Sequence, residues 1–385
     1  MPCSSWMKSK ISLGLYLHIP FCAGKCAYCD FYSLHRPEAR QAYTKVLAEQ
    51  IRAYGAKCED YRLDTVYFGG GTPSYLGGAA LCQLLDAVKE SFALSPAGEI
   101  TAEANPESMT ADFLAEIRRA GFNRLSIGVQ SMDNEELAVL GRLHTAQEAK
   151  AAYERAQQAG FDNISVDLMY GLPGQTMASW ESSLTEIICW QPTHISCYGL
   201  KLEAGTPLAR QQPELPDDDT QADMYLLACE KLREAGYRHY EISNFAKEGR
   251  LSRHNSRYWD LSEYLGLGPG AHSFWKGRRF AFDRDLDAYL TGQPHSHREE
   301  EIPGFTQREE YLMLMLRTDR GLDEQAFQQK FQQALEPYER VLTKYKKAGL
   351  TEQHEGRWRL TETGFLVSNP IIQEVLQAQP EEEII

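Results

Sequence analysis

The sequence predicts an α/β fold, a partial (β/α)6 barrel followed by a helical, winged-helix-like domain. Strand-like apolar runs alternate with helical patterns at intervals of about 30 residues, which is typical of βαβ units. Several of the predicted helices end at a glycine, as at Gly121, Gly160 and Gly236. From about residue 301 the pattern changes to helices followed by a short hairpin, which indicates a separate C-terminal domain.

Six strands and six helices account for the predicted barrel. The strands are Leu13–Ile19, Thr65–Phe68, Glu99–Ala104, Arg124–Val129, Asn163–Leu168 and His194–Tyr198. The helices are Ala39–Tyr54, Leu81–Phe92, Ala111–Ala120, Ala146–Ala159, Trp180–Trp190 and Gln221–Ala235. We expect the barrel over residues 1–250, a loop-rich extension over 251–300, and the winged-helix-like domain over 301–385.

The composition limits the partners and the compartment. The net charge of −14 argues against broad nucleic-acid binding, which needs a basic surface. Nine cysteines in 385 residues are too few for a disulfide scaffold and fit the reducing cytoplasm. No apolar run approaches the length of a membrane span, so we expect membrane contact only through a partner.

Three cysteines follow the first predicted strand at C-x3-C-x2-C spacing: Cys22, Cys26 and Cys29. Thiolates are the usual ligands of iron–sulfur clusters, and a [4Fe–4S] cluster with three protein ligands keeps one iron open for a substrate. Three other interpretations remain at this point, and one of them is a chance clustering of buried cysteines in a chain that has nine. The last two cysteines could be a C-x2-C redox pair, or the loop could bind zinc with His18 or His35.

Polar or glycine-rich motifs follow the next strands, and ligands of parallel α/β folds bind at the carboxyl ends of strands. Gly70, Gly71 and Thr72 follow the second strand, where glycines allow a ligand to approach the backbone or simply form a tight turn. Glu103 ends the third strand, where its carboxylate could accept hydrogen bonds from ribose hydroxyls or cap a helix.

The fourth and fifth strands continue this pattern. Gln130 follows the fourth strand and offers both a donor and an acceptor. Arg142 follows, and its guanidinium could bind a carboxylate or face water. Asp167 lies in the fifth strand, before a Gly-Leu-Pro-Gly turn. Such motifs at consecutive strand ends, after the cysteine loop, predict a ligand site there.

The segment from Leu17 through the three cysteines to Phe31 resembles the radical S-adenosylmethionine (SAM) enzymes, and most closely the oxygen-independent coproporphyrinogen III oxidase group. The resemblance covers most of the chain and implies a radical-SAM barrel, a [4Fe–4S] cluster held by Cys22, Cys26 and Cys29, and SAM bound at its open iron. The residues that match SAM-contacting positions are Tyr16, Tyr28, Gly70, Gly71, Thr72, Glu103, Gln130, Arg142 and Asp167.

Residues 240–275 are rich in histidine and aromatic residues and show little periodicity, which favours a loop-rich cap over a ligand. Imidazole is an ordinary axial ligand of haem iron, although His254 and His272 could equally be structural histidines. The run His254-Asn255-x-x-Tyr258-Trp259 resembles the haem-binding branch of this group, the HemW-type haem chaperones. The resemblance implies that this chain binds haem and that His254 is a ligand of the haem iron.

Two features favour the chaperone branch over the oxidases. The oxidases have a fourth cysteine two residues after the third, where this chain has Phe31, and they carry a longer N-terminal segment. We therefore expect a haem carrier without coproporphyrinogen oxidase activity that delivers haem to respiratory acceptor proteins. The oxidase remains an alternative, as does a zinc protein with a β/α barrel. Whether the chain is a homodimer or a monomer, and whether it cleaves SAM, stays open.

The C-terminal region contains predicted helices at Thr306–Leu316, Asp323–Lys330 and Leu335–Ala348, then a hairpin of Leu350–Gln353 and Arg357–Leu360. Winged-helix modules of this kind often bind DNA. Here acidic residues outnumber basic ones 15 to 10 over residues 301–385, which argues against DNA binding. We expect a docking or lid domain instead.

Overall fold

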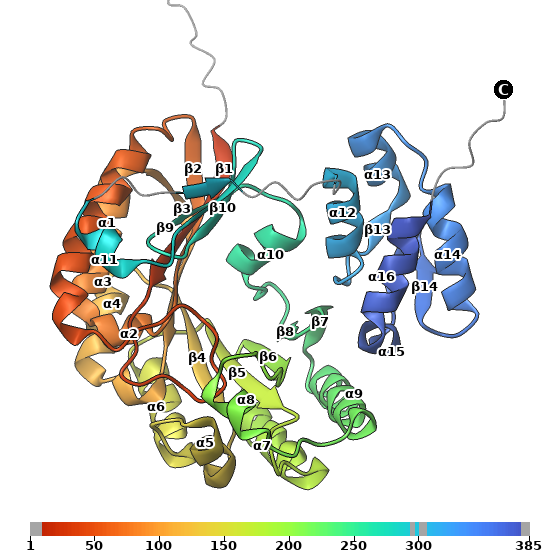
Figure 1. The fold of residues 1–385 in the computed structure, drawn as a ribbon, viewed down its shortest axis with the longest axis horizontal. Coiled ribbons are helices and arrows are strands. Elements are labelled where there is room, and N and C mark those ends of the chain that lie inside the picture. The colour runs from red at the N-terminus through yellow and green to blue at the C-terminus, as the bar shows by residue number, and fades with distance from the viewer. Residues whose placement is uncertain (1–9, 293–296, 300–305, 379–385) are drawn as a thin grey trace, which may run out of the picture. The chain divides into compact units, whose positions relative to one another are not determined.

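The computed structural model describes residues 10–292, 297–299 and 306–378, the short segment 297–299 by its backbone only. The chain forms two compact units. The first contains residues 1–128, 147–162 and 262–301, and the second contains residues 129–146, 163–261 and 302–385. Both units are interrupted in sequence, so each is assembled from segments far apart in the chain (Figure 1).

The first unit is built on a mixed sheet with the order β12-β11-β10-β9-β1-β2-β3-β4. Strand β1 is central: it pairs in parallel with β2 on one side and with β9 on the other. Helices α1, α3 and α4 pack in a row along the parallel strands (Figure 1). The strands are β1 Ile11–Ile19, β2 Tyr61–Gly70, β3 Ala93–Ala104, β4 Arg124–Gln130, β9 Tyr264–Leu267, β10 His272–Trp275, β11 Arg278–Phe282 and β12 His297–Glu299. The helices are α1 Arg40–Gly55, α2 Pro73–Leu76, α3 Gly78–Ser91, α4 Ala111–Ala120, α6 Ala146–Gln158 and α11 Leu286–Leu290.

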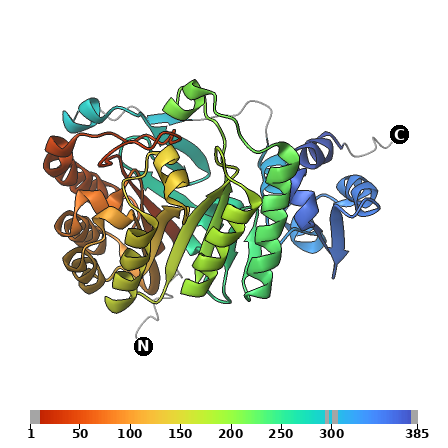
Figure 2. The same cartoon turned by 90° about the horizontal axis from the view of Figure 1, so that it is seen from below.

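The barrel-like part of the second unit contains a sheet of order β5-β6-β8-β7, in which β5 and β6 are parallel. Helices α7 and α9 pack together beside it (Figure 2). The Trp180 indole of α7 donates a hydrogen bond to the Met224 carbonyl of α9. The elements are α5 Asn134–Leu140, β5 Ile164–Tyr170, α7 Met177–Trp190, β6 His194–Gly199, α8 Pro207–Gln211, α9 Asp218–Glu234, β7 Arg238–Glu241, β8 Asn244–Ala246 and α10 Arg253–Trp259.

The C-terminal part of the second unit has the predicted helices and hairpin, and a short β13 completes a three-stranded antiparallel sheet of order β13-β15-β14. Its helices enclose an apolar core of its own that includes Phe327, Tyr338 and Trp358. The elements are α12 Gln307–Met315, β13 Leu322–Asp323, α13 Glu324–Phe331, α14 Glu336–Lys346, β14 Thr351–His354, β15 Arg357–Leu360, α15 Glu362–Leu366 and α16 Ser368–Gln377.

All six predicted strands and six predicted helices of the barrel are present, and in neither unit does a sheet close on itself, which confirms an open α/β architecture. In the segment 251–300, which was expected to be rich in loops, the described residues include the short elements α10, β9, β10, β11 and α11. These elements span only four to seven residues each, too short for periodicity to reveal them. Within the described part of the chain, no helix has both the length and the apolar character needed to cross a bilayer.

Candidate functional site

The three cysteines lie on the loop that leaves the carboxyl end of β1. Backbone hydrogen bonds fix both ends of this loop: the Cys22 amide donates to the Leu34 carbonyl over 3.1 Å, and the Leu34 amide donates to the Pro20 carbonyl over 2.8 Å. Cys22, Cys26 and Cys29 take part in no disulfide bond within the described chain, and all three are half-buried. The loop therefore presents three thiols from a fixed base at the strand end, where ligands of α/β folds bind.

The three sulfurs influence one another. Burial raises the pKa of the Cys29 thiol, and the neighbouring Cys26 and Cys22 raise this pKa further. The Thr72 hydroxyl donates a hydrogen bond to Cys22 Sγ over 3.2 Å. A thiol set of this kind fits a multinuclear cluster, whose metal charge removes the thiol protons and whose hydrogen bonds to sulfur adjust its potential.

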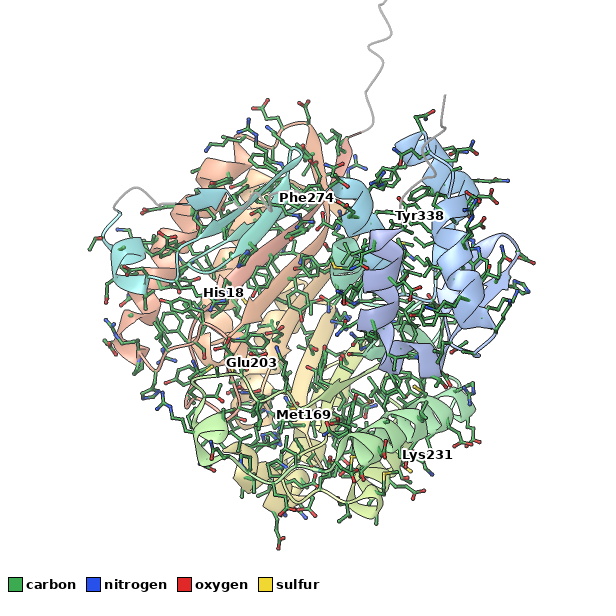
Figure 3. All side chains as sticks on the ribbon, turned by 45° about the vertical axis from the view of Figure 1, so that its right-hand side comes forward. His18, Met169, Glu203, Lys231, Phe274 and Tyr338 are labelled. Carbon is green, nitrogen blue, oxygen red and sulfur yellow. The ribbon has the colours of Figure 1, made fainter. Side chains whose placement is uncertain are left out.

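A zinc site on this loop finds less support. Zinc holds its donor atoms within about 4 Å of one another, and in the described chain the cysteine loop provides no group of three donors within 4.8 Å. Both ring nitrogens of His18, which is labelled in Figure 3, are already engaged: Nδ1 with the Tyr16 hydroxyl at 3.0 Å and Nε2 with the Tyr32 carbonyl at 2.9 Å. Burial also lowers the pKa of His18 to about 4, so its ring is neutral at pH 7.

The glycine-rich motif joins the ends of β1 and β2. The amides of Gly71 and Thr72 donate to the Ile19 and Phe21 carbonyls, each over 2.8 Å. A Cβ on Gly71 would lie 2.8 Å from the Phe21 carbonyl oxygen, so this close approach of the two strand ends requires glycine. These hydrogen bonds hold the motif against the start of the cysteine loop.

Glu103 lies beside this turn at the end of β3. Its Oε2 accepts a hydrogen bond from the Gly70 amide over 3.0 Å, and its Oε1 accepts one from the Tyr67 hydroxyl over 2.8 Å. Tyr16 stacks on Tyr67 with ring centroids 6.2 Å apart. These contacts hold the carboxylate in place at the strand end. Tyr28 is half-buried on the cysteine loop itself.

Gln130, in the second unit, ends β4 with a φ of +71°, which is unusual for a residue with a side chain. A buried anchor holds this turn: the Ser131 hydroxyl donates to Glu136 Oε2 over 2.5 Å. Glu136 also accepts hydrogen bonds from Ser179 at 2.7 Å and Gln175 at 3.0 Å. Strained backbone of this kind persists where the surroundings fix it, often at ligand sites. Glu136 was not predicted as a functional residue, because in the sequence it is an ordinary acid in the first turn of a helix.

Arg142 and Asp167 lie in the same unit. Arg142 is half-buried directly after α5, where its amide donates to the Leu137 carbonyl over 2.9 Å. Asp167 is half-buried on β5 and accepts a 3.5 Å hydrogen bond from Ser165. Asp167 pairs with Ser196 on β6, two residues before Tyr198, which is on the same face of the sheet. Tyr198 therefore lies near Asp167, a relation that the sequence did not reveal.

The predicted haem ligand, His254, lies on α10 and is fully buried. Its Nε2 is 2.9 Å from the Tyr258 hydroxyl, one turn further along the helix. The two rings meet edge to face, 5.5 Å apart. In this conformation His254 does not present Nε2 to an external ligand, so binding haem iron through this atom would require the Tyr258 contact to be exchanged.

Comparison with known proteins places these residues in context. The model of the Radical SAM superfamily matches residues 16–187, and that of the HemN C-terminal domain matches residues 306–367. A curated protein of Lactococcus lactis named Heme chaperone HemW is 36% identical over 94% of this chain and 96% of its own length. The protein of the same name from Bacillus subtilis is 34% identical over 92% of this chain and 97% of its own length. The one from Escherichia coli is 41% identical over 68% of this chain and 69% of its own length.

Among solved structures, the coproporphyrinogen III oxidase HemN of Escherichia coli, described as a radical SAM enzyme, has a similar fold. Its TM-score is 0.83 at 23% identity, over 96% of this chain and 91% of that chain. At this identity the similarity concerns the fold alone. It confirms the α/β fold class with a helical C-terminal region.

Proposed function

The chain belongs to the Radical SAM superfamily, in the group of the HemW-type haem chaperones, and we propose that it binds haem and transfers it to acceptor proteins. The observation that carries the proposal is the similarity to curated haem chaperones over nearly the whole of both chains. We propose respiratory haem proteins as acceptors and the cytoplasm as the compartment. The acidic net charge supports a role without nucleic acid.

We further propose that the cysteine loop holds a [4Fe–4S] cluster and that SAM binds beside it. Cys22, Cys26 and Cys29 would ligate the cluster, and the half-buried position of all three supports this assignment. Such a cluster supplies an electron and an open iron. The chain's own contribution is to hold the ligand: the proposed SAM contacts are Tyr16, Tyr28, Gly70, Gly71, Thr72, Glu103, Gln130, Arg142 and Asp167.

In the proposed function haem is the cargo, with His254 as its candidate ligand. Because Tyr258 occupies Nε2 of this histidine, haem would compete with an internal hydrogen bond. Tyr258→Phe should therefore strengthen haem binding, and His254→Ala should weaken it while leaving the cluster spectrum unchanged. Haem titrations followed by the Soret band would test both variants, and unchanged affinity in His254→Ala would remove this residue as the ligand.

The alternative is an oxygen-independent coproporphyrinogen III oxidase, whose group the cysteine loop also resembles. Phe31 weighs against it, since it occupies the position of the fourth cysteine of the oxidases and its side chain is 69% exposed. The deciding experiment is a turnover assay with anaerobically reconstituted chain, SAM, a reductant and coproporphyrinogen III. Sustained formation of protoporphyrinogen IX would make the chain an oxidase. No product, with stoichiometric haem binding, would support the chaperone.

A further inference from the structure

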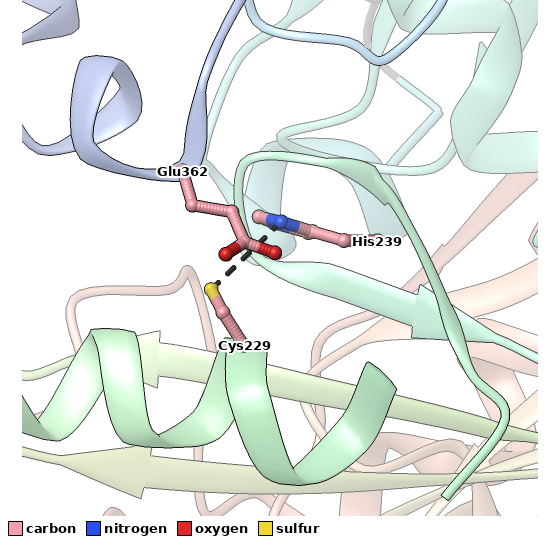
Figure 4. A group of neighbouring side chains, drawn as sticks. All are labelled: Cys229, His239 and Glu362. Atoms are coloured by element: carbon pink, nitrogen blue, oxygen red, sulfur yellow. Dashed lines mark hydrogen bonds between the residues drawn. The ribbon is translucent and has the colours of Figure 1, made fainter. Parts of the chain in front are cut away.

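Three metal-binding side chains from three separate elements meet in the second unit, away from the cysteine loop in sequence (Figure 4). Cys229 comes from α9, His239 from β7 and Glu362 from the start of α15. One donor atom of each lies within 4.8 Å of the other two, and Cys229 Sγ is 3.9 Å from His239 Nδ1. Cys229 is fully buried, and the other two are half-buried.

The surroundings of His239 orient its ring as they would that of a metal ligand. Its Nε2 faces the Ile242 carbonyl at 3.4 Å, so this nitrogen carries the proton and Nδ1 keeps its lone pair toward Cys229. The ring stacks on Phe245 with centroids 4.2 Å apart and meets the edge of Phe365 at 5.3 Å. Metal-binding histidines typically donate their second N–H to a carbonyl in this way, which fixes tautomer and orientation.

The charge and protonation of the group are also compatible with a metal ion. Burial lowers the pKa of His239, so its imidazole is neutral at pH 7. The Arg233 guanidinium contacts both oxygens of Glu362, at 2.7 and 2.8 Å, and holds the carboxylate in place. Burial raises the pKa of the Cys229 thiol to about 12, so without a metal this cysteine is protonated and a bound metal would displace its proton.

We propose that Cys229, His239 and Glu362 bind one divalent transition-metal ion, preferably Zn²⁺, with a water molecule as the fourth ligand. At Zn–S and Zn–N distances of about 2.3 and 2.0 Å, tetrahedral geometry separates sulfur and nitrogen by roughly 3.5 Å. The observed 3.9 Å between Cys229 Sγ and His239 Nδ1 needs only a small contraction. A thiolate and an imidazole favour zinc over the oxygen-binding ions Mg²⁺ and Ca²⁺.

Such an ion would link the C-terminal domain to the helix α9. Glu362 lies within the region that matches the HemN C-terminal domain, whereas Cys229 and His239 precede that region by more than sixty residues. Without the metal, the Arg233–Glu362 ion pair makes this link, and exposed ion pairs stabilise proteins weakly. None of the three residues belongs to the sets proposed for the cluster, SAM or haem.

The test uses the full chain with Cys22, Cys26 and Cys29 all replaced by serine, so that the cluster cysteines cannot bind the added metal. After incubation with Zn²⁺ and desalting, we expect one zinc per chain by elemental analysis, and Co²⁺ should give a thiolate charge-transfer band. Adding Cys229→Ser should weaken zinc affinity by about 100-fold or more, since even residues that only orient ligands contribute about 10–100-fold. The matched control is Cys197→Ser, which alters another buried cysteine of the same unit.

A second measurement does not depend on replacing a buried residue. Glu362→Gln removes a ligand from a half-buried position and preserves the size of the side chain. Zn²⁺ should raise the melting temperature of the cluster-reconstituted wild-type chain but not that of Glu362→Gln. The proposal is overturned if the triple-serine chain retains no zinc, if Cys229→Ser and Cys197→Ser bind zinc equally, or if Zn²⁺ stabilises Glu362→Gln as much as wild type.

Discussion

Replacing Gly70 by alanine should destabilise the first unit by about 3–4 kcal/mol, through two separable effects. Gly70 has a φ of +114°, and an L-residue at positive φ costs roughly 1–2 kcal/mol. In addition, the new Cβ would lie 2.5 Å from His18 Cε1, so the ring must move. Moving it breaks the hydrogen bonds of His18 with Tyr16 and with the Tyr32 carbonyl, at about 1 kcal/mol each.

Gly77 provides a matched control. Its φ of +100° is comparable, but a Cβ there would meet nothing within 4 Å, so Gly77→Ala should cost only the backbone term of about 1–2 kcal/mol. The free energies of unfolding of the two variants, measured by urea unfolding, should therefore differ by about 2 kcal/mol. In a His18→Ala background the ring is absent, and the two alanine substitutions should become equal. This account of Gly70 would be refuted if both alanine substitutions cost the same stability in the wild-type background. It would also be refuted if Gly70→Ala remained the more destabilising substitution in the His18→Ala background.

Three further predictions concern other parts of the chain. Burial raises the pKa of Glu241 to about 7, so the stability it contributes is fully present below the unfolded pKa near 4.5 and is lost as the pH rises to about 7. Glu241→Gln should remove this decline. Urea unfolding should then give the variant a free energy of unfolding up to about 3 kcal/mol above that of wild type at pH 8, and no gain at pH 4.5. Thr72→Val removes the hydroxyl that donates to Cys22 Sγ, and it should lower the midpoint potential of a bound cluster. A redox titration followed by EPR would measure this potential, and an unchanged value would contradict a role for the hydrogen bond. Cys26→Ala should abolish the cluster, and a variant that still binds four iron and four sulfide ions per chain would contradict the assigned ligands.

Helices and strands whose sequence signals are all local could be predicted from the sequence alone. The helix Ala111–Ala120 was predicted at its exact bounds because its apolar face, its Thr110 cap and its terminal Gly121 all lie within a dozen residues. Strand β3 begins at Ala93, earlier than predicted, because its first residues pair with Arg62 and Leu63 before a register shift that no local pattern indicates.

Features that depend on distant residues escaped prediction. Strand β9 has four buried residues, Tyr264–Leu267, and its identity as a strand depends on pairing with β1, some 250 positions earlier. Cys229 and His239 could be noted from their spacing, but their third partner, Glu362, lies in another predicted domain. The acid Glu136 likewise gains its importance only from the three side chains that donate to it.

The central position of β1 has a consequence for how the chain is made. Ribosomes synthesise a chain from its N-terminal end, so β1 and its cysteine loop emerge well before the partner strand β9, which follows after residue 260. At about 5–20 residues per second, this leaves one side of β1 unpaired for more than about 10 seconds. An unpaired strand edge readily pairs with other chains. The nascent protein therefore passes through a period in which its cysteine loop is attached to an open sheet edge, and slower translation of residues 130–260 should increase its aggregation during synthesis.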